Sequence, residues 1–373
     1  MAGERRPSIL MTADTVGGVW TYAVELAGAL DRLGFHVHLA TMGAPLRPYQ
    51  RMQLQGCGRV AVYESEFRLE WMPEPWDDVK RAGHWLLALE RNLRPDLVHL
   101  NQFAFGALPF HAPKLVVAHS CVLTWWTAVH GTAAPAEWSR YRSRVAAGLE
   151  GADLVAAPTR SMLDSLHGHY RHSTPGRVLP NGRDASLFRP GPKKPFIFAA
   201  GRLWDEAKNL AALEAVAPSL DWPVRVAGSC VRPDRPALIP EGVQALGQLT
   251  AQGVARQMAR AAIYALPARY EPFGLSVLEA ALSGCALVLG DIPSLREVWQ
   301  DAALYVDPGD HDALRQTLSR LIRQPVERSR MAAAAQARAA EFSPSAMVRA
   351  YLDACASLNP RLEPARREEL QCA

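Results

Sequence analysis

The sequence predicts an α/β protein built from two doubly wound domains, each around a parallel sheet. Short apolar runs alternate with segments of helical period along the whole chain, which is typical of repeated βα units. The chain has 373 residues, whereas a single hydrophobic core stops growing at roughly 250–300 residues. The βα alternation also stops at a segment rich in proline and glycine, residues 181–195, and then starts again.

The composition narrows the classes of protein that the chain can represent. It is 49% hydrophobic and 21% charged, so it can bury a large core. Its 41 Lys and Arg against 37 Asp and Glu give a net charge of +4, which supplies no basic field for nucleic acid. The six cysteines lack metal-ligand spacing, and we expect reduced thiols in a cytoplasmic protein without a secretion signal.

The first half of the chain starts with an apolar run, residues 8–13, followed by a helix. Ala23, Leu26, Leu30 and Leu33 form one apolar face of this helix, and Gly34 ends it. Six more apolar runs read as strands. The expected strands of this half are 8–13, 37–41, 60–63, 97–101, 115–119, 154–157 and 178–180.

Residues 115–136 contain no Asp, Glu, Lys or Arg and would be long enough to cross a bilayer. Histidines, hydroxyl side chains, Gly131 and Pro135 interrupt the stretch. We therefore expect a buried strand, 115–119, that runs into a polar and aromatic loop. Trp125 and Trp126 in this loop either pack in the core and at its rim or stack against a bound sugar or lipid.

The second half repeats the βα alternation after the segment rich in proline and glycine. Helices are expected at 326–342 and from Ser343 to Ser357. We expect an N-terminal domain at 1–181, a linker at 182–195, a C-terminal domain at 196–344, and a helix at about 345–373 that packs back onto the first domain. The expected strands are 196–200, 224–227, 243–246, 263–266, 286–289 and 304–306.

The turn from Arg269 onward is the most informative segment for function. A Pro-Phe-Gly turn precedes a helix, so the backbone N–H groups of Phe273, Gly274 and Leu275 would face an anion such as a diphosphate. Glu271 before the turn and Glu279 inside the helix would then accept hydrogen bonds from sugar hydroxyls on either side of that anion. The alternative is that Glu271 is an ordinary turn residue and that Glu279 occupies a solvated position on an ordinary helix.

Two cations follow the first strand of the second domain. Arg202 and Lys208 lie at the carboxyl end of that strand, where cations can neutralise a bound diphosphate. A surface ion pair with Asp205 or Glu206 is the alternative interpretation.

Asp310 and Asp312 form an Asp-x-Asp sequence that would suit a metal ion in other enzymes. Here they open a helix, so Asp310 is expected to cap it and Asp312 to lie in its first turn. We therefore expect no catalytic metal.

Taken together, these segments resemble the retaining nucleotide-sugar glycosyltransferases of family four, which have the GT-B fold of two facing Rossmann-like domains. The resemblance is strongest from residue 178 to residue 310, and its most specific element is the pair of glutamates eight residues apart. The matching segments are Gly17-Gly18, 180–190, 201–209, 271–279, 291–297 and 303–308.

The resemblance implies a role for each cation and carboxylate of the second domain. Arg202 and Lys208 would stabilise the leaving nucleoside diphosphate, and Glu279 would hold the ribose hydroxyls. Glu271, with the backbone of residues 273–275, would orient the donor sugar and the distal phosphate. Arg183 departs from the family pattern, which has a small apolar residue after Asn-Gly.

The resemblance also implies roles for residues of the first domain. The loop at Gly17 and Gly18 would let backbone N–H groups approach the diphosphate or the acceptor. His119 would contact a hydroxyl of the donor sugar, although a lone histidine at this place can equally be a core residue with its hydrogen bonds satisfied.

The implied reaction is transfer of a hexose, with mannose or glucose preferred, to a glycan, lipid-linked or small-molecule hydroxyl acceptor. It would retain configuration without an enzymic nucleophile, a metal or a cofactor other than the nucleotide-sugar co-substrate. Arg140, Arg142 and Arg144 beside Trp138 suggest weak contact with the inner membrane surface, or simply a solvated helix face. A nucleotide-sugar epimerase and a non-catalytic nucleotide-sugar-binding subunit are the alternatives.

Overall fold

The chain divides into two compact units. The structure, a computed structural model, describes residues 5–231 and 239–363. Unit 1 contains the chain up to Thr124, residues 132–182 and the segment from Pro344 onward, and unit 2 contains residues 125–131 and 183–343. This division departs from the expected boundaries in two places. Residues 125–131 group with unit 2, and so do residues 183–195, which were expected to form a separate linker.

Unit 1 is built on a seven-stranded parallel sheet with the order β3-β2-β1-β4-β5-β6-β7. Strand β1 lies between β2 and β4 and is buried over its whole length, which explains its mainly apolar sequence. The strands are β1 (Ser8–Asp14), β2 (His36–Met42), β3 (Ala61–Glu64), β4 (Leu97–Leu100), β5 (Lys114–Val117), β6 (Leu154–Ala157) and β7 (Gly176–Val178).

All seven strands overlap their expected positions, and only in β5 and β7 does an end differ by two residues. The last strand ends at Val178 instead of beginning there, and β5 ends at Val117, so that His119 follows the strand. The helices of this part of the chain are α1 (Gly18–Arg32), α2 (Pro48–Gln55), α3 (Trp76–Leu93), α4 (Val122–His130), α5 (Ser139–Glu150) and α6 (Arg160–Tyr170).

Helix α4 corrects the expectation of a loop after β5. The sequence Val122-Leu-Thr-Trp-Trp-Thr-Ala-Val-His130 contains no proline or glycine, and its apolar side chains stabilise a helix. Gly131, with a φ of 68°, ends it in the left-handed conformation that glycine adopts readily. Of the residues that suggested a loop, Thr124, Thr127 and His130 lie on this helix.

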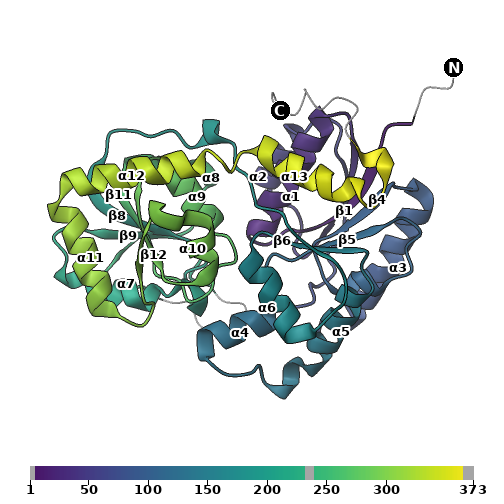
Figure 1. Cartoon of the computed structure of the whole chain (residues 1–373), viewed down its shortest axis with the longest axis horizontal. Helices are drawn as coiled ribbons and strands as arrows, with labels where there is room; N and C mark the ends of the chain where they lie inside the picture. Colours follow the sequence, from purple (N-terminus) through teal and green to yellow (C-terminus); the bar gives the residue numbers. More distant parts are fainter. Residues whose placement is uncertain (1–4, 232–238, 364–373) are drawn as a thin grey trace. The chain divides into compact units, whose positions relative to one another are not determined.

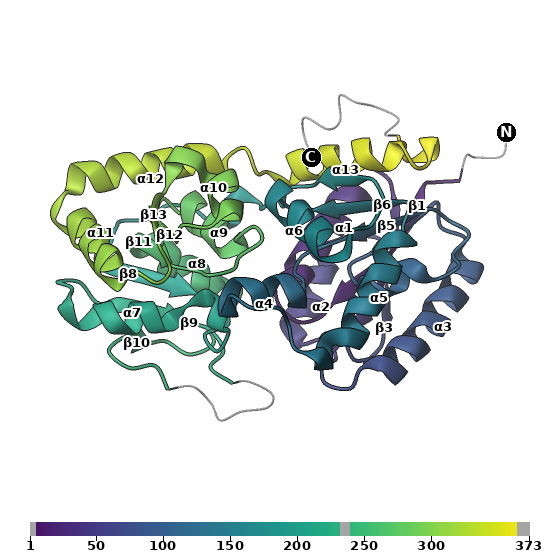
Figure 2. The same cartoon turned by 60° about the horizontal axis from the view of Figure 1, so that its bottom comes forward.

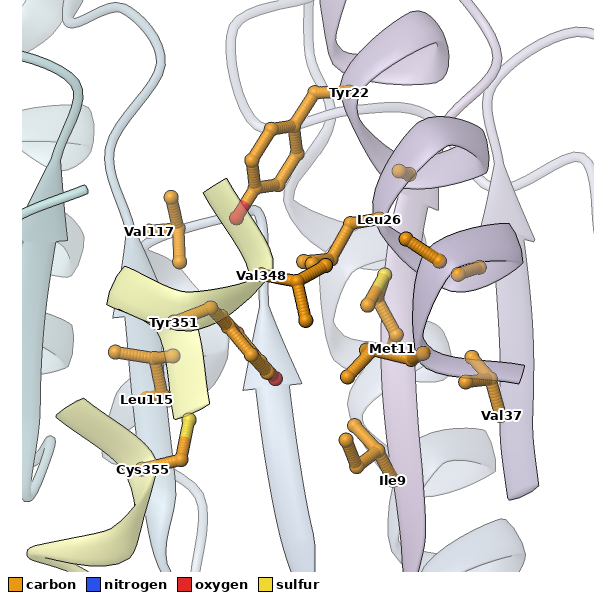
Figure 3. Packing of buried hydrophobic residues seen from close by; sticks show 14 of the residues in the cluster. Ile9, Met11, Tyr22, Leu26, Val37, Leu115, Val117, Val348, Tyr351 and Cys355 are labelled. Carbon is orange, nitrogen blue, oxygen red and sulfur yellow. The ribbon is translucent and has the colours of Figure 1, made fainter. Parts of the chain in front are cut away.

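Helix α13 (Pro344–Ala356) belongs to unit 1 although it follows the whole of unit 2 in the sequence. It packs beside α1, as Figure 1 shows for the yellow and purple helices. Figure 3 shows Val348 of α13 beside Leu26 of α1, and Cys355 of α13 near Leu115 of β5, all in one core cluster. The expected return of a C-terminal helix is seen for α13, and residues 364–373 lie outside the described residues.

Unit 2 has a six-stranded parallel sheet with the order β10-β9-β8-β11-β12-β13, labelled in Figure 2. Each of its strands overlaps an expected one. The strands are β8 (Lys194–Ala200), β9 (Val224–Ala227), β10 (Gln244–Ala245), β11 (Ala261–Leu266), β12 (Ala286–Gly290) and β13 (Leu304–Val306).

Helices cover both faces of the second sheet, and two core clusters lie between them and the strands. Phe198, Tyr264 and Trp299 are among the largest fully buried side chains. The helices are α7 (Leu210–Val216), α8 (Ala251–Arg260), α9 (Leu275–Leu282), α10 (Pro293–Trp299), α11 (His311–Arg323) and α12 (Pro325–Ala339). Among the described helices of both units, none combines the length and the apolar character that a membrane span requires.

Candidate functional site

The turn between β11 and α9 is shaped by Gly274 and Glu271. Gly274 has a φ of 88°, and a Cβ atom there would lie 3.0 Å from Val277 Cγ2, so that glycine is favoured on both counts. The Gly274 N–H donates a hydrogen bond of 3.0 Å to Glu271 Oε1. This corrects the expectation that the N–H group of Gly274 is free, because a carboxylate of the chain itself accepts from it here.

Lys208 and Glu271 form an ion pair, with 2.5 Å between Lys208 Nζ and Glu271 Oε2. Both side chains are mostly buried, and they come from the loops that follow β8 and β11. Ser294 Oγ donates to the Glu271 carbonyl oxygen at 2.6 Å and links this loop to α10. The structure therefore brings together two of the predicted site residues at the carboxyl edge of the sheet, where open α/β sheets bind ligands.

Asn209 holds the loop that carries Lys208. It has a left-handed φ of 56°, and its Nδ2 donates to the carbonyl oxygens of Pro267 at 2.9 Å and Pro308 at 2.8 Å. One buried amide thus joins the loops that follow β8, β11 and β13. No local pattern marks Asn209 for this role, since its partners lie 58 and 99 residues away along the chain.

Arg202 lies in the same loop and pairs with Asp205, with 2.8 Å between Nη2 and Oδ2. This is the alternative ion pair expected from the sequence, although the Arg202 side chain remains 42% exposed. The Trp125 indole N–H donates to Asp205 Oδ1 at 3.0 Å. Burial raises the pKa of Asp205, but the charges of Arg202 and Lys208, together with hydrogen bonds from Trp125 and Ala207, lower the pKa overall.

Glu279 points from α9 toward Arg183, with 2.9 Å between its Oε1 and Arg183 Nη2. Only 11% of the Arg183 side chain and 16% of the Glu279 side chain are exposed. The guanidinium also lies 5.0 Å from the centre of the Phe188 ring, a distance at which a cation is attracted by an aromatic face. The residue that departs from the family pattern therefore contacts the carboxylate predicted to bind ribose.

Phe273 and Leu275 flank Gly274 in different surroundings. Phe273 is buried in the core of unit 2, with its ring 5.5 Å from that of Phe342. Leu275 is the first residue of α9 and packs against the same cluster. Their side chains thus anchor the turn, and their predicted contribution to ligand binding is limited to the backbone.

The predicted residues of unit 1 lie at the carboxyl edge of its own sheet. Gly17 precedes α1 with a φ of 81°, Gly18 begins that helix, and both are exposed. His119 follows β5, and its Nε2 lies 2.7 Å from Asn101 Oδ1. Burial, with a smaller contribution from His99, lowers the pKa of His119 to about 3.

Asp310 caps α11, as predicted, because its Oδ1 accepts a hydrogen bond of 2.8 Å from the Ala313 N–H. Asp312 lies in the first turn and pairs with Arg315. Within residues 5–231 and 239–363, no three side chains of His, Cys, Asp or Glu are grouped so that they could hold a metal ion.

Comparison with known proteins adds a family assignment to this geometry. Residues 16–187 match the model described as Glycosyltransferase Family 4, and residues 194–324 match the model described as Glycosyl transferases group 1. The chain is 26% identical over 356 residues to the alpha-maltose-1-phosphate synthase of Mycolicibacterium smegmatis, a match that covers 83% of this chain and 86% of the relative.

A shorter match and a solved structure extend the comparison. The chain is 33% identical to the Escherichia coli O-antigen chain mannosyltransferase B over 101 residues. This match covers 27% of this chain and 26% of that relative. The crystal structure of Anabaena HepE in complex with UDP-glucose has a TM-score of 0.76 at 16% identity and covers 94% of this chain and 100% of that one. This likeness shows that the two parallel-sheet domains have the GT-B fold.

Proposed function

Because the chain belongs to the family 4 glycosyltransferases, we propose that it transfers a hexose from a nucleoside-diphosphate sugar to a hydroxyl acceptor with retention of anomeric configuration. Mannose and glucose are the preferred sugars. The mannosyltransferase of Escherichia coli and the HepE complex with UDP-glucose support this choice of sugars. The acceptor is a glycan, a lipid-linked saccharide or a small molecule.

The observation that carries the proposal is the Lys208–Glu271 pair beside the start of α9. A cation and a carboxylate that neutralise each other without ligand can both change partners when a charged sugar donor binds. Lys208 then contacts a phosphate oxygen, and Glu271 accepts a hydrogen bond from a sugar hydroxyl. The backbone of residues 273–275 supports the distal phosphate at the helix start.

Arg202 provides the second cation for the diphosphate. Its exposed guanidinium pairs with the Asp205 carboxylate. Asp205 also accepts hydrogen bonds from the Trp125 indole N–H and the Ala207 N–H, which hold the carboxylate, and with it Arg202, in one place. Such preorganised charge stabilises the diphosphate as it departs, at no cost of reorganisation during the reaction.

Glu279 binds the ribose hydroxyls in this proposal. A carboxylate offers about four acceptor positions, so Glu279 can keep Arg183 as a partner while it accepts from a hydroxyl group. In unit 1, the backbone at Gly17 and Gly18 approaches the diphosphate or the acceptor, and His119 contacts the sugar.

The reaction then needs neither a protein nucleophile nor a metal ion. The bond between the anomeric carbon and the diphosphate oxygen breaks, and the acceptor oxygen bonds to that carbon on the same face. The acceptor proton passes to the leaving phosphate oxygen. Catalysis rests on positioning and on charge stabilisation by Arg202, Lys208 and the backbone at the start of α9.

The first test is a binding panel. Uridine, guanosine and adenosine diphosphates are added to the protein and to Glu279→Ala, and the melting temperature is measured, since a ligand that binds the folded state raises it. We expect one nucleotide to give a selective shift that Glu279→Ala abolishes. No shift with any of the three would contradict nucleotide-sugar binding.

The second test measures transfer and its stereochemistry. We expect a product whose anomeric signals in NMR match the configuration of the donor, and rates that a chelator does not change. Lys208→Ala and Arg202→Ala should each lower turnover by about 10²–10³, by analogy with the loss of one oxyanion donor. Arg315→Ala on α11 is the matched control, because this arginine makes a similar ion pair three residues apart, with the exposed Asp312, and contacts none of the site residues named above. Normal turnover in both site variants would refute the assignment.

A further inference from the structure

A chain of polar side chains runs through the interior of unit 1, from α13 to the ends of β4 and β5. Tyr351 Oη lies 3.1 Å from His99 Nδ1, and His99 Nε2 lies 3.1 Å from Asn101 Oδ1. The same Asn101 Oδ1 lies 2.7 Å from His119 Nε2. One amide oxygen thus faces a nitrogen from each of two imidazole rings.

The orientation of the Asn101 amide is fixed by its other contacts. Asn101 Nδ2 donates to the carbonyl oxygen of Thr12 at 2.5 Å, and the Asn101 N–H donates to Thr12 Oγ1 at 2.8 Å. A carbonyl oxygen only accepts hydrogen bonds, so the atom beside it must be the NH₂ group. The atom that faces both imidazoles is therefore the amide oxygen, which also only accepts.

An acceptor that faces two ring nitrogens determines where the protons lie. His99 Nε2 and His119 Nε2 must each carry a hydrogen, because a bare nitrogen beside Asn101 Oδ1 would bring two lone pairs together. Burial lowers the pKa of His99 to about 4 and that of His119 to about 3, so both rings are neutral near pH 7. His99 Nδ1 then accepts from the Tyr351 hydroxyl, and His119 Nδ1 carries a lone pair.

His119 Nδ1 lies where a ligand can reach it. The ring follows β5 at the carboxyl edge of the sheet and is only half-buried, with the Tyr22 ring 4.6 Å away on one side. Among residues 5–231 and 239–363, the hydrogen bond to Asn101 is the contact that holds this ring, and no described group hydrogen-bonds Nδ1. The ring thus offers one acceptor atom in a fixed direction.

We propose that Asn101 is a positioning residue that fixes His119 as the neutral Nε2–H tautomer, so that His119 Nδ1 accepts a hydrogen bond from a hydroxyl group of the sugar substrate. This inference rests on the proposed function. His119 acts as a hydrogen-bond acceptor that orients the sugar, and it takes no proton during the reaction. Asn101 determines the tautomer of His119, and Thr12, His99 and Tyr351 hold Asn101 through the hydrogen bonds described above.

Nitrogen-15 NMR of the histidine rings tests the tautomer in the unaltered protein, without a ligand. We expect His119 Nδ1 to show the shift of an unprotonated ring nitrogen and Nε2 that of an N–H group, with no titration between pH 5 and pH 8. The His119 signals are assigned by their loss in His119→Gln. An N–H signal at Nδ1, or titration within this range, would overturn the proposal.

Asn101→Asp tests the positioning role through pH. A carboxylate beside both imidazoles favours their charged forms. We expect His119 to titrate between pH 5 and pH 8 in this variant and KM for the donor to rise as the pH falls, while kcat changes less. Asn92→Asp, an exposed position on α3, is the matched control and should keep the flat profile. A flat profile in folded Asn101→Asp would contradict the positioning role.

Monodeoxy analogues of UDP-glucose and GDP-mannose identify the contacted hydroxyl. With the parent donor that reacts, we expect His119→Ala to lower kcat/KM about tenfold. With the analogue that lacks the contacted hydroxyl, we expect the unaltered protein and His119→Ala to have the same kcat/KM. An equal loss with every analogue would overturn the contact with the sugar. If neither parent donor reacts, the failure lies with the proposed function, and the NMR measurement alone decides the tautomer.

Discussion

Arg183 Nη2 lies 2.9 Å from Glu279 Oε1, and both side chains are largely buried. The chain therefore neutralises its predicted ribose-binding carboxylate with a cation from the segment just before β8. A buried ion pair adds little net stability by itself, but the loss of one partner leaves an uncompensated charge. This asymmetry allows the pair to be tested by single and double substitution.

Arg183→Ala should lower the free energy of unfolding by about 3 kcal/mol, because it removes the Arg183 cation from the buried Glu279 carboxylate. Arg183→Ala combined with Glu279→Gln should recover most of that loss. Denaturant unfolding measures both. As a control, the Arg296–Asp291 pair joins two exposed side chains, so Arg296→Ala should have a much smaller effect. Equal losses in the single and the double variant would contradict the coupling.

Asn209→Asp should destabilise unit 2 by about 2 kcal/mol or more, because a carboxylate cannot donate to the carbonyl oxygens of Pro267 and Pro308. The variant should also lower turnover, since the same amide holds the loop with Lys208. Thermal unfolding and donor kinetics check the two effects. Asn92→Asp on the surface of α3 serves as the control for added negative charge. A variant with unchanged stability would exclude this role.

Glu70 predicts a dependence of stability on pH. Its carboxylate is buried and accepts from the Phe103 and Ala104 N–H groups at 3.0 and 2.8 Å. Burial raises the pKa of Glu70 to about 7, against the lowering by these two hydrogen bonds. Between the ordinary pKa and pH 7, the folded state therefore binds more protons than the unfolded state, and this group makes the protein less stable as pH rises.

Glu70→Gln removes that dependence. The melting temperature of the variant, compared with that of the parent, should rise steadily from pH 4.5 to pH 7 and level off above it. Glu66→Gln, an exposed position four residues earlier, is the control and should show a constant difference. A constant difference for Glu70→Gln as well would mean that the carboxylate does not titrate in this range.

Gly148→Ala should strongly destabilise unit 1. A Cβ atom at this position of α5 would lie 1.8 Å from the Phe103 carbonyl oxygen, so the helix would have to move away from the segment at 103–107. Gly168→Ala on α6 is the matched control, because a Cβ atom there meets nothing within 4 Å. That substitution should stabilise the protein by about 0.5–1 kcal/mol through helix propensity. Similar melting temperatures for the two variants would contradict the close packing.

The central strands were predictable because they are short apolar runs buried on both faces of a parallel sheet, as β1 and β11 show. Helix α4 was not, because its histidine and two threonines resemble the residues of a loop and its apolar residues alone set no clear period. The capping by Asp310 was predictable from neighbouring residues, since the cap and its partner are three positions apart.

The candidate site was predictable only in part. The sequence indicates which side chains lie at the carboxyl ends of strands, and Lys208 and Glu271 were found in this way. It does not indicate their partners. Asn209 contacts Pro308, 99 residues away, and His99 contacts Tyr351, 252 residues away, and no local pattern records such pairs.

The return of α13 to unit 1 has a consequence for biosynthesis. Tyr351, Val348 and Cys355 fill part of the core around α1 and β5, yet they leave the ribosome only after all of unit 2 has been made. The segment from Arg183 to Ser343 is continuous and can form its sheet as soon as it emerges. The unit that is translated first thus completes its core last, and until then the apolar side chains of α1 and β5 that belong to the same cluster lack the cover that α13 gives them.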